Sequence, residues 1–445
     1  MRTISLFLLM FLCVEADAQP GLVPMAFPGA EGYGSHAIGG RYGKVIFITT
    51  LEDYDHDEEQ IKGSFRYAVT RDYPRIIVFR VSGYIELKRE VVITDSYITI
   101  AGHTAPGEGI CLKNHGLRIR AHDVVVRFLR VRPGDTYGMH HPGWSTDAIT
   151  VSNPSKNVII DHCSTRWSND EVITLSGDQV DSVTVQWCII SESLARSTHR
   201  KGEHGYASLV RTGGNASFHH NIYAHHVSRV PRPGTYGNRS GFLDFRNNLI
   251  YNTRQGGYTA KDSAKLNYVC NYVKQGPDSE KSYVFRVGGE STMVYFSGNE
   301  LYARDGSLIT DNQEVLISDI EDGTELDHPF PSAPMRTDAT AELPCMLFKN
   351  AGAISPHRDN VDKRILNEIR SGSGKIINTQ RESGGWPSLQ PGRLTTDRDM
   401  DGMDDQWEES MGLSVTDAGD SGEHDLSKDY TNIEVYLSEL AQSKK

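Results

Sequence analysis

The middle of the chain contains seven short strand-like segments that can be aligned on one residue in each. They are DVVVRFLRV, NVIIDHCST, SVTVQWCII, ASFHHNIYA, FLDFRNNLIYN, LNYVCNYV and MVYFSGNEL. The aligned residues are Leu129, Cys163, Cys188, Asn221, Asn248, Asn271 and Asn299, with spacings of 34, 25, 33, 27, 23 and 28 residues. A strand-like repeat of this length and irregular period predicts a β-solenoid, in which short parallel strands alternate with loops of variable length.

The four asparagines in this column support stacked coils. Equivalent residues of neighbouring coils lie about 4.8 Å apart, so asparagine side chains in one column can form a ladder of amide hydrogen bonds. The alternative is that they are ordinary turn residues. A solenoid also needs a cover at its open end. Residues 63–72, GSFRYAVTRD, fit an amphipathic capping helix with Ser64 as its N-cap. We therefore expect an all-β solenoid with an N-terminal capping helix.

The two ends of the chain differ from this repeat. Residues 1–18 have a basic start, a short apolar stretch and alanines at positions 16 and 18. This pattern is typical of a secretory signal peptide and is too short for a membrane span. We therefore predict an exported protein without a membrane span, located outside the cell, in the periplasm or at the cell surface. The remainder divides into a solenoid domain, residues 19–390, and a small C-terminal unit, residues 391–445.

Positive charge is concentrated in one segment of an otherwise acidic chain. The formal net charge is −12, yet residues 196–232 contain Arg196, Arg200, Lys201, Arg211, Arg229 and Arg232, with Glu203 as the one acid. A solvated basic face is one interpretation. Nucleic acid is a poor partner, because the rest of an acidic protein would repel it. A polymer with regularly spaced carboxylates, such as polygalacturonate, fits an exported protein better.

Acidic residues precede this basic segment on what would be neighbouring coils. Asp147, Asp161, Asp170 and Glu171 lie in DAITV, VIIDH and SNDEV. Each could be an isolated surface acid, but stacked carboxylates repel one another unless a cation joins them. Hard oxygen ligands favour Ca²⁺ over zinc. The sequence therefore predicts a calcium site beside the basic segment, with a carboxylate substrate between the two.

Four motifs carry a resemblance to a known family. They are AFPGAEGYG (26–34), AGHTAPGEGI (101–110), VIIDH (158–162) and SFHHNIYAHHVSRVPR (217–232). Together they resemble the extracellular pectate lyases of polysaccharide lyase family one, over residues 25–275 and again from about 390. Several spaced motifs are more specific than one short pattern. The resemblance implies a right-handed parallel β-helix and Ca²⁺-dependent β-elimination of polygalacturonate, the pectin backbone.

The resemblance also implies roles for individual residues. Arg229 corresponds to the arginine that abstracts the proton, and Lys201 and Arg232 correspond to substrate-binding cations. Lys201 is the alternative base, because its intrinsic pKa lies below that of arginine. Asp147 and Asp170 match calcium ligands. The chain departs from the pattern where better-known members have further acidic ligands, since Ser145 and Thr174 stand there, and Glu171 is placed to compensate.

A separate acidic pattern lies near the C-terminus. DRDMDGMDDQWE, residues 397–408, fits the calcium-loop pattern D-x-D-x-D-G-x5-E. The predicted ligands are Asp397, Asp399, Asp401, Asp405 and Glu408. A solvated acidic turn is the alternative. Proline and glycine upstream argue against an entering helix, so the loop differs from a paired EF-hand. We expect helices in DQWEESMGL and YTNIEVYLSELA, and another near residues 361–370.

Two other functions remain open at this stage. A solenoid glycoside hydrolase of the polygalacturonase kind would need paired catalytic carboxylates and no calcium. A polyuronate-binding protein without activity would keep the acids and arginines but give no products. The basic segment beside the acids favours elimination over these two alternatives. Separately, we expect the protein to act as a monomer.

Overall fold

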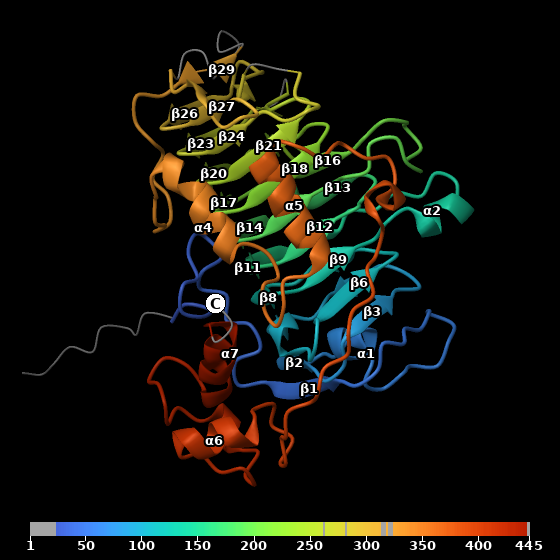
Figure 1. Ribbon diagram of the computed structural model, residues 1–445. Coiled ribbons are helices and arrows are strands. Elements are labelled where there is room, and N and C mark those ends of the chain that lie inside the picture. The colour runs from blue at the N-terminus through green and yellow to red at the C-terminus, as the bar shows by residue number, and fades with distance from the viewer. Residues whose placement is uncertain (1–23, 261–262, 281–282, 313–316, 319–323, 443–445) are drawn as a thin grey trace, which may run out of the picture.

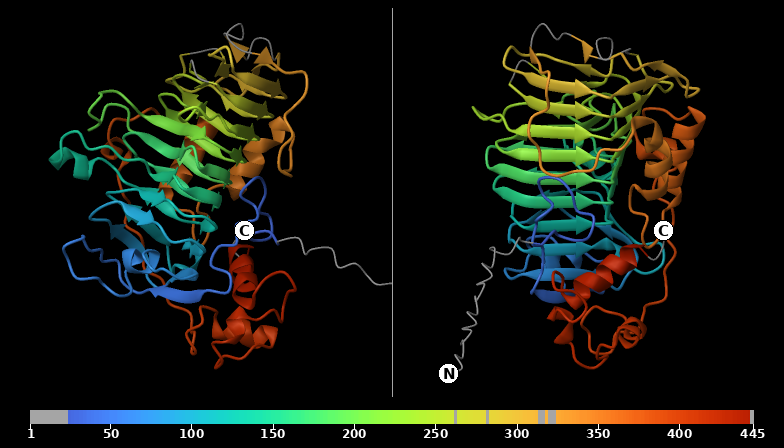
Figure 2. Two further views of the ribbon diagram at one scale, coloured as in Figure 1. Left: turned by 180° about the vertical axis from the view of Figure 1, so that it is seen from behind. Right: turned by 90° about the vertical axis from the view of Figure 1, so that its left-hand side faces the viewer.

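The computed structural model describes residues 24–260, 263–280, 283–312, 317–318 and 324–442. The predicted signal peptide, residues 1–18, lies outside them. Within the described chain, strands stack into one long parallel β-helix (Figures 1 and 2). The coils between residues 75 and 233 contribute strands in turn to three sheets, which we call sheet 1, sheet 2 and sheet 3. The predicted parallel β-helix is confirmed.

The strands are short, and nearly every pair in the three sheets is parallel. Sheet 1 contains β1 (Lys44–Ile48), β2 (Arg75–Phe79), β5 (Ile98–Ala101), β8 (Val124–Arg127), β11 (Ser155–Asp161), β14 (Val180–Gln186), β17 (Asn215–His219), β20 (Phe242–Arg246), β23 (Lys265–Val269), β26 (Met293–Ser297) and β30 (Thr324–Glu325). Sheet 2 contains β3 (Gly83–Glu86), β6 (Ile110–Lys113), β9 (Arg130–Arg132), β12 (Ser164–Arg166), β15 (Ile189–Ser191), β18 (Ile222–His226), β21 (Leu249–Thr253), β24 (Tyr272–Lys274), β27 (Glu300–Tyr302) and the antiparallel β28 (Leu308–Thr310). Sheet 3 contains β4 (Val91–Ile93), β7 (Leu117–Ile119), β10 (Ile149–Ser152), β13 (Glu171–Gly177), β16 (Tyr206–Thr212) and β19 (Arg232–Pro233). A further small sheet joins β22 (Gly257–Tyr258), β25 (Phe285–Arg286) and β29 (Ile317–Ser318).

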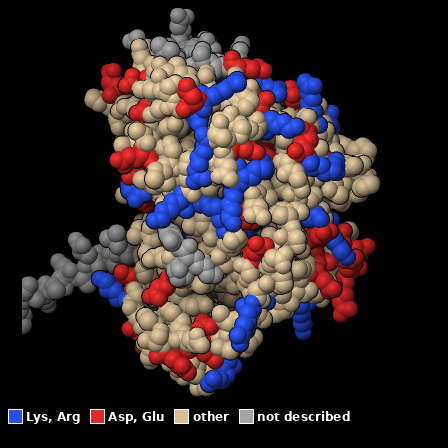
Figure 3. All heavy atoms as spheres, in the orientation of Figure 1, with Lys and Arg blue, Asp and Glu red and all other residues tan. Residues whose placement is uncertain are grey.

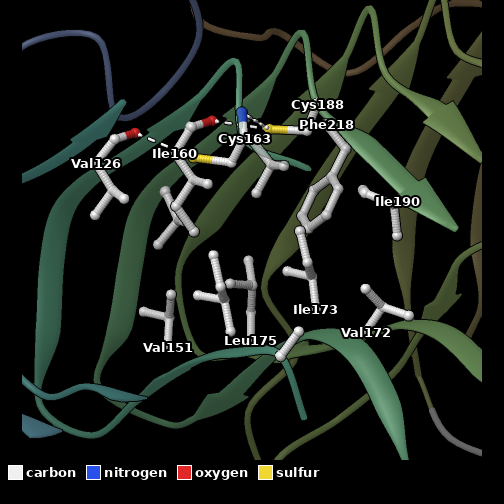
Figure 4. Close-up of a cluster of buried hydrophobic side chains, with 14 of the residues drawn as sticks. Val126, Val151, Ile160, Cys163, Val172, Ile173, Leu175, Cys188, Ile190 and Phe218 are labelled. Atoms are coloured by element: carbon white, nitrogen blue, oxygen red, sulfur yellow. Dashed lines mark hydrogen bonds between the residues drawn. The ribbon is translucent and has the colours of Figure 1, made fainter. Parts of the chain in front are cut away.

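The interior of the helix is a continuous apolar core. Val126, Ile160, Leu175 and Phe218 come from four strands and are all fully buried (Figure 4). Alternate residues of each strand point inward, so every coil adds apolar side chains against the coils above and below it. This stacking explains why no single coil is stable alone and why the fold needs many repeats.

The asparagine column forms the expected ladder. The side-chain oxygen of Asn248 accepts from the backbone nitrogen of Asn221 at 3.0 Å, and that of Asn271 accepts from the backbone nitrogen of Asn248 at 3.0 Å. Asn299 continues the series beneath Asn271 at 2.9 Å. All four side chains are fully buried. The ladder pairs amide groups that the tight corner between sheets 1 and 2 would otherwise leave without partners.

The residue before each position of the aligned column turns the chain. His162, Trp187, His220 and Asn247 all have φ between 50° and 55°, in the left-handed region. One residue in that conformation redirects the backbone from sheet 1 into sheet 2. The outer side chains of these corners stack as well, with the rings of Trp187 and His220 centred 4.5 Å apart.

Helices cover the solenoid at one end and along one side. The N-terminal cap is α1 (Phe65–Val69), and Ser64 accepts from the backbone nitrogen of Tyr67, which confirms the predicted N-cap. Two helices, α4 (Leu343–Asn350) and α5 (Asn360–Ser371), lie along sheet 2, where Lys and Arg side chains gather on the outer surface (Figures 1 and 3). The remaining helices are α2 (Thr136–His140), α6 (Asp405–Met411), α7 (Asn432–Gln442) and the 3-10 helices η1 (Gly102–Thr104), η3 (Thr340–Glu342), η4 (Gln380–Ser383) and η5 (Asp420–Gly422).

Buried ion pairs fasten α5 to sheet 2. Arg132 donates to Asp359 at 2.6 Å, and Arg364 lies 2.7 Å from Glu192. The predicted helix near residues 361–370 is therefore confirmed, as are those in DQWEESMGL and YTNIEVYLSELA. Each helix in the described part of the chain is too short or too polar to cross a membrane.

Candidate active site

The candidate site forms at the edge of sheet 3 where its strands begin. The pairing of β10 with β13 brings Asp147 beside Glu171, and the backbone nitrogen of Glu171 donates to Asp147 Oδ1 at 3.1 Å. Glu171 pairs in turn with Tyr206, the first residue of β16, and Tyr206 forms a bridge with Ser228 on the next coil. The register of a parallel sheet therefore aligns residues that lie far apart in the sequence.

Three of the predicted acidic ligands converge here. Each of Asp147, Asp170 and Glu171 offers a carboxylate oxygen within 4.8 Å of the others. Burial, and then the negative charge of Asp170, raises the pKa of Asp147 to about 7. Thr150 Oγ1 also donates to Asp147 at 2.8 Å. A group of carboxylates this close is a suitable ligand set for a hard divalent cation.

Arg229 reaches the same cluster from the following coil. Its guanidinium forms an ion pair with Glu171 and lies over the ring of Tyr206, 4.0 Å from the ring centre. The Arg229 side chain is about one-fifth exposed, so it is anchored yet accessible from solvent. Its φ of 63° is left-handed, which costs a non-glycine residue roughly 1–2 kcal/mol.

Two histidines that the sequence did not single out as site residues surround Asp170. The nearest ring nitrogens of His199 and His204 lie 3.4 and 3.8 Å from the Asp170 carboxylate, and their rings stack 3.6 Å apart. Burial lowers the pKa of His199, although Asp170 acts in the opposite direction. The pair holds Asp170 in place beside Glu171. Sequence spacing alone does not reveal this, because the loop between β15 and β16 folds back over the strand ends.

The two predicted substrate-binding cations occupy different surroundings. Lys201 lies in that same loop with an exposed side chain, and its backbone nitrogen donates to His199 Nδ1 at 3.1 Å. Arg232 begins β19 and pairs with Leu209 of β16, so it lies on the same sheet as Glu171 and is partly exposed. Lys201 precedes β16 and Arg232 lies three residues after Arg229, so both lie on the coils next to the cluster.

Asp161 is not brought to this group. It ends β11 in sheet 1, is fully buried, and accepts from Arg127 at 2.8 Å, from Gln186 at 2.7 Å and from His162 at 2.8 Å. Burial alone would raise the pKa of Asp161, but His162 and Arg127 outweigh it and hold that pKa below its usual range. Its role is to join coils inside the fold, and we leave it out of the proposed cation site.

The C-terminal acidic loop forms a second convergence. Asp397, Asp399 and Asp401 lie within ligand distance of one another, and Asp401 and Glu408 converge likewise with Asp420. Asp405, at the ninth position of the pattern, instead accepts from the backbone nitrogen of Arg398 at 2.8 Å. Asp420 was not predicted, because it lies beyond the loop pattern in the sequence.

The fold and the edge site define a class of protein: a parallel β-helix with carboxylates and basic groups clustered at one sheet edge. Comparison with known proteins narrows this class. The chain is 34% identical over 435 residues to a probable pectate lyase C of Aspergillus flavus, covering 94% of each chain. It is also 34% identical over 427 residues to a probable pectate lyase C of Emericella nidulans, covering 94% of this chain and 93% of the relative.

Similarity of this extent over nearly the whole length shows that the chain belongs to the pectate lyase family of polysaccharide lyases.

Solved structures share the fold. The cedar pollen allergen Jun a 1 aligns with a TM-score of 0.55 at 16% identity, covering 73% of this chain and 93% of the allergen. A pectate lyase bound to a hexasaccharide aligns with a TM-score of 0.53 at 15% identity, covering 75% and 98%. No family model matches the chain.

Proposed function

We propose that this protein cleaves polygalacturonate by Ca²⁺-dependent β-elimination at the edge of sheet 3. The observation that carries the proposal is the convergence of Asp147, Asp170 and Glu171 with Arg229, which pairs with Glu171. It supports a cation ligand set and a guanidinium at one solvent-accessible point. A uronate sugar has its acidic C5 proton next to a carboxylate, so both groups can act on the same ring.

The three carboxylates fit a calcium ion. Together they carry up to three negative charges on hard oxygen ligands, and Arg229 offsets one of them. Ca²⁺ bound there would neutralise the uronate carboxylate and stabilise the charge that develops on it. His199 and His204 hold Asp170, and Thr150 holds Asp147, so the ligands are positioned before substrate arrives.

Arg229 is assigned the base that removes the C5 proton. The neutral side chain of Arg229 takes the C5 proton, a C4–C5 double bond forms, and the C4–O bond to the neighbouring sugar breaks as its oxygen leaves and takes a proton from water. The ring of Tyr206 and the carboxylate of Glu171 fix the guanidinium in place. Lys201 and Arg232 bind carboxylates of adjacent sugars, and Lys201 is the alternative base. The protein is exported and acts as a monomer.

One assay separates elimination from the alternatives. The purified protein is incubated with polygalacturonate in the presence of Ca²⁺ or of EDTA. Elimination yields unsaturated products that absorb ultraviolet light, and EDTA abolishes them. Saturated oligomers that persist in EDTA would indicate a hydrolase instead. Binding without any product would indicate a polyuronate-binding protein and would refute the proposed reaction.

A further inference from the structure

We infer that the C-terminal unit holds a calcium ion of its own, bound by Asp397, Asp399, Asp401, Glu408 and Asp420. The unit lies beside β1 and β2 at the first coils of the solenoid (Figures 1 and 2). It is separate from the edge of sheet 3, and the site plays no part in the chemistry proposed above.

The backbone already has the form of a cation-binding loop. The carboxylate of Asp397 accepts from the backbone nitrogens of Asp401 at 3.1 Å and Gly402 at 3.2 Å. Asp401 Oδ1 accepts from Met403 at 2.8 Å. Gly402 has a φ of 97°, which is accessible mainly to glycine and turns the loop sharply at its sixth position. The remaining carboxylate oxygens are thereby left to face the loop interior.

Buried oxygens without partners indicate a cation-binding site. Glu408 is fully buried, and neither of its carboxylate oxygens has a hydrogen-bond partner. Asp401 is 2% exposed and its Oδ2 also lacks one, as do both oxygens of Asp399 and Oδ1 of Asp420. Leaving ionised oxygens buried and unpaired is costly, so this arrangement is explained by a ligand that coordinates them together.

The donor set selects the ion. All five groups are carboxylates, and Asp401, Glu408 and Asp420 offer oxygens within 4.8 Å of one another. Carboxylates this close repel one another unless a cation joins them, and Ca²⁺ accepts six to eight oxygen ligands in flexible geometry. Asp420 replaces the ligand that Asp405 fails to supply, because the chain returns to the loop at η5.

The loop also forms the joint between the C-terminal unit and the solenoid. Arg80, directly after β2, donates to Asp397 at 3.0 Å. Met403 packs with Val78 and Ile433 in an apolar cluster between sheet 1 and α7. A Cβ added to Gly402 would lie 3.0 Å from Val45, so the turn sits directly on β1. A cation that orders the loop therefore fixes the cover over the outer face of the first coils.

The test counts bound calcium ions and measures thermal unfolding in the full-length protein. Asp170→Asn removes one ligand of the substrate-site cluster, and Glu408→Gln removes one from the C-terminal loop. We expect Asp170→Asn to keep one tightly bound Ca²⁺ and a calcium-dependent rise in Tm of roughly 2–5 °C. Glu408→Gln loses that ion and most of the rise. Glu409→Gln is the matched control on the exposed side of α6. It keeps the ion of the C-terminal loop and the calcium-dependent rise in Tm.

A misfolded Glu408→Gln protein would not leave the inference untested, because the Asp170→Asn protein retains an unaltered C-terminal loop. If Asp170→Asn bound no calcium and its Tm were the same in Ca²⁺ and EDTA, the inference would be overturned. It would also be overturned if folded Glu408→Gln bound as many ions as Glu409→Gln. Neither result depends on activity, so the assignment of the reaction is tested separately.

Discussion

Arg229 and Glu171 are joined by the register of sheet 3, and each depends on the other. The planar guanidinium pairs with Glu171 while lying over Tyr206. Lysine carries one compact ammonium group and cannot make both contacts in the same way. A lysine at position 229 would therefore lose part of the contact with Glu171 and Tyr206 while keeping the positive charge.

We predict that Arg229→Lys lowers kcat on polygalacturonate about 10²- to 10⁴-fold, the contribution typical of a positioned general base. Steady-state formation of unsaturated product measures it. Arg120→Lys is the control and keeps wild-type turnover, because Arg120 follows the last residue of β7, away from the strand starts, and donates to the carbonyl of Asn153. Near-normal turnover of Arg229→Lys would remove Arg229 from the role of base and leave Lys201 as the candidate.

The acids of the site show what a sequence can and cannot specify at this scale. Asp147 and Glu171 could be predicted to meet, because Asp147 lies two residues before β10 and Glu171 begins β13 on the next coil. Asp161 has the same local pattern of acid beside an apolar strand, but it ends a strand of sheet 1. A linear sequence does not say to which sheet of a coil a strand belongs, so the sequence alone does not separate Asp161 from the acids of sheet 3.

At the level of single elements, the asparagine ladder is the feature that the sequence predicts most fully. The repeat places one amide per coil, and stacking then determines its partners. The capping helix α1 is equally predictable from Ser64 and its apolar face. Helix α4 was not foreseen, because its apolar face packs on sheet 2 through contacts far apart in the chain. Long-range packing of that kind leaves no periodic signal of its own.

Removal of one amide from the ladder should destabilise the fold strongly. Asn248 accepts from the backbone of Asn221 and donates to the carbonyl of Phe218 at 3.0 Å. Alanine leaves both groups buried without partners, at about 1–3 kcal/mol each. We predict that Asn248→Ala lowers the free energy of unfolding by about 2–6 kcal/mol in urea denaturation. The exposed Asn238→Ala should change it by less than about 0.5 kcal/mol, and equal stability of the two variants would refute the ladder's role.

At the scale of the whole molecule, the contact between the C-terminal unit and the solenoid makes stability depend on pH. His103 is buried, and its Nε2 lies 3.0 Å from the carbonyl of Leu437 in α7. Burial, and then the charge of Arg127, lower the pKa of His103 to about 3, while the hydrogen bond to Leu437 opposes this. In the unfolded chain the imidazole titrates near 6.5.

The unfolded state therefore binds more protons than the folded state between about pH 6.5 and pH 3. Stability from this group is complete above about pH 6.5 and is lost as the pH falls. We predict that His103 contributes up to about 1.4 kcal/mol per pH unit to the slope of the unfolding free energy against pH. Denaturation curves from about pH 7 to pH 4 measure this slope. His103→Gln can still donate to Leu437, and it should make the slope smaller. The exposed His140→Gln should not, and an unchanged slope in His103→Gln would contradict the argument.

The central claim is that one uronate sugar contacts both the cation held by Asp147, Asp170 and Glu171 and the side chain at position 229. A crystal structure of the Arg229→Lys variant with Ca²⁺ and an oligogalacturonate tests it most directly. The account predicts a Ca²⁺ about 2.3–2.6 Å from oxygens of the three acids and of a sugar carboxylate, with C5 of that sugar facing the substituted side chain. Sugar bound on another face of the solenoid, or a cation that does not touch it, would contradict the account.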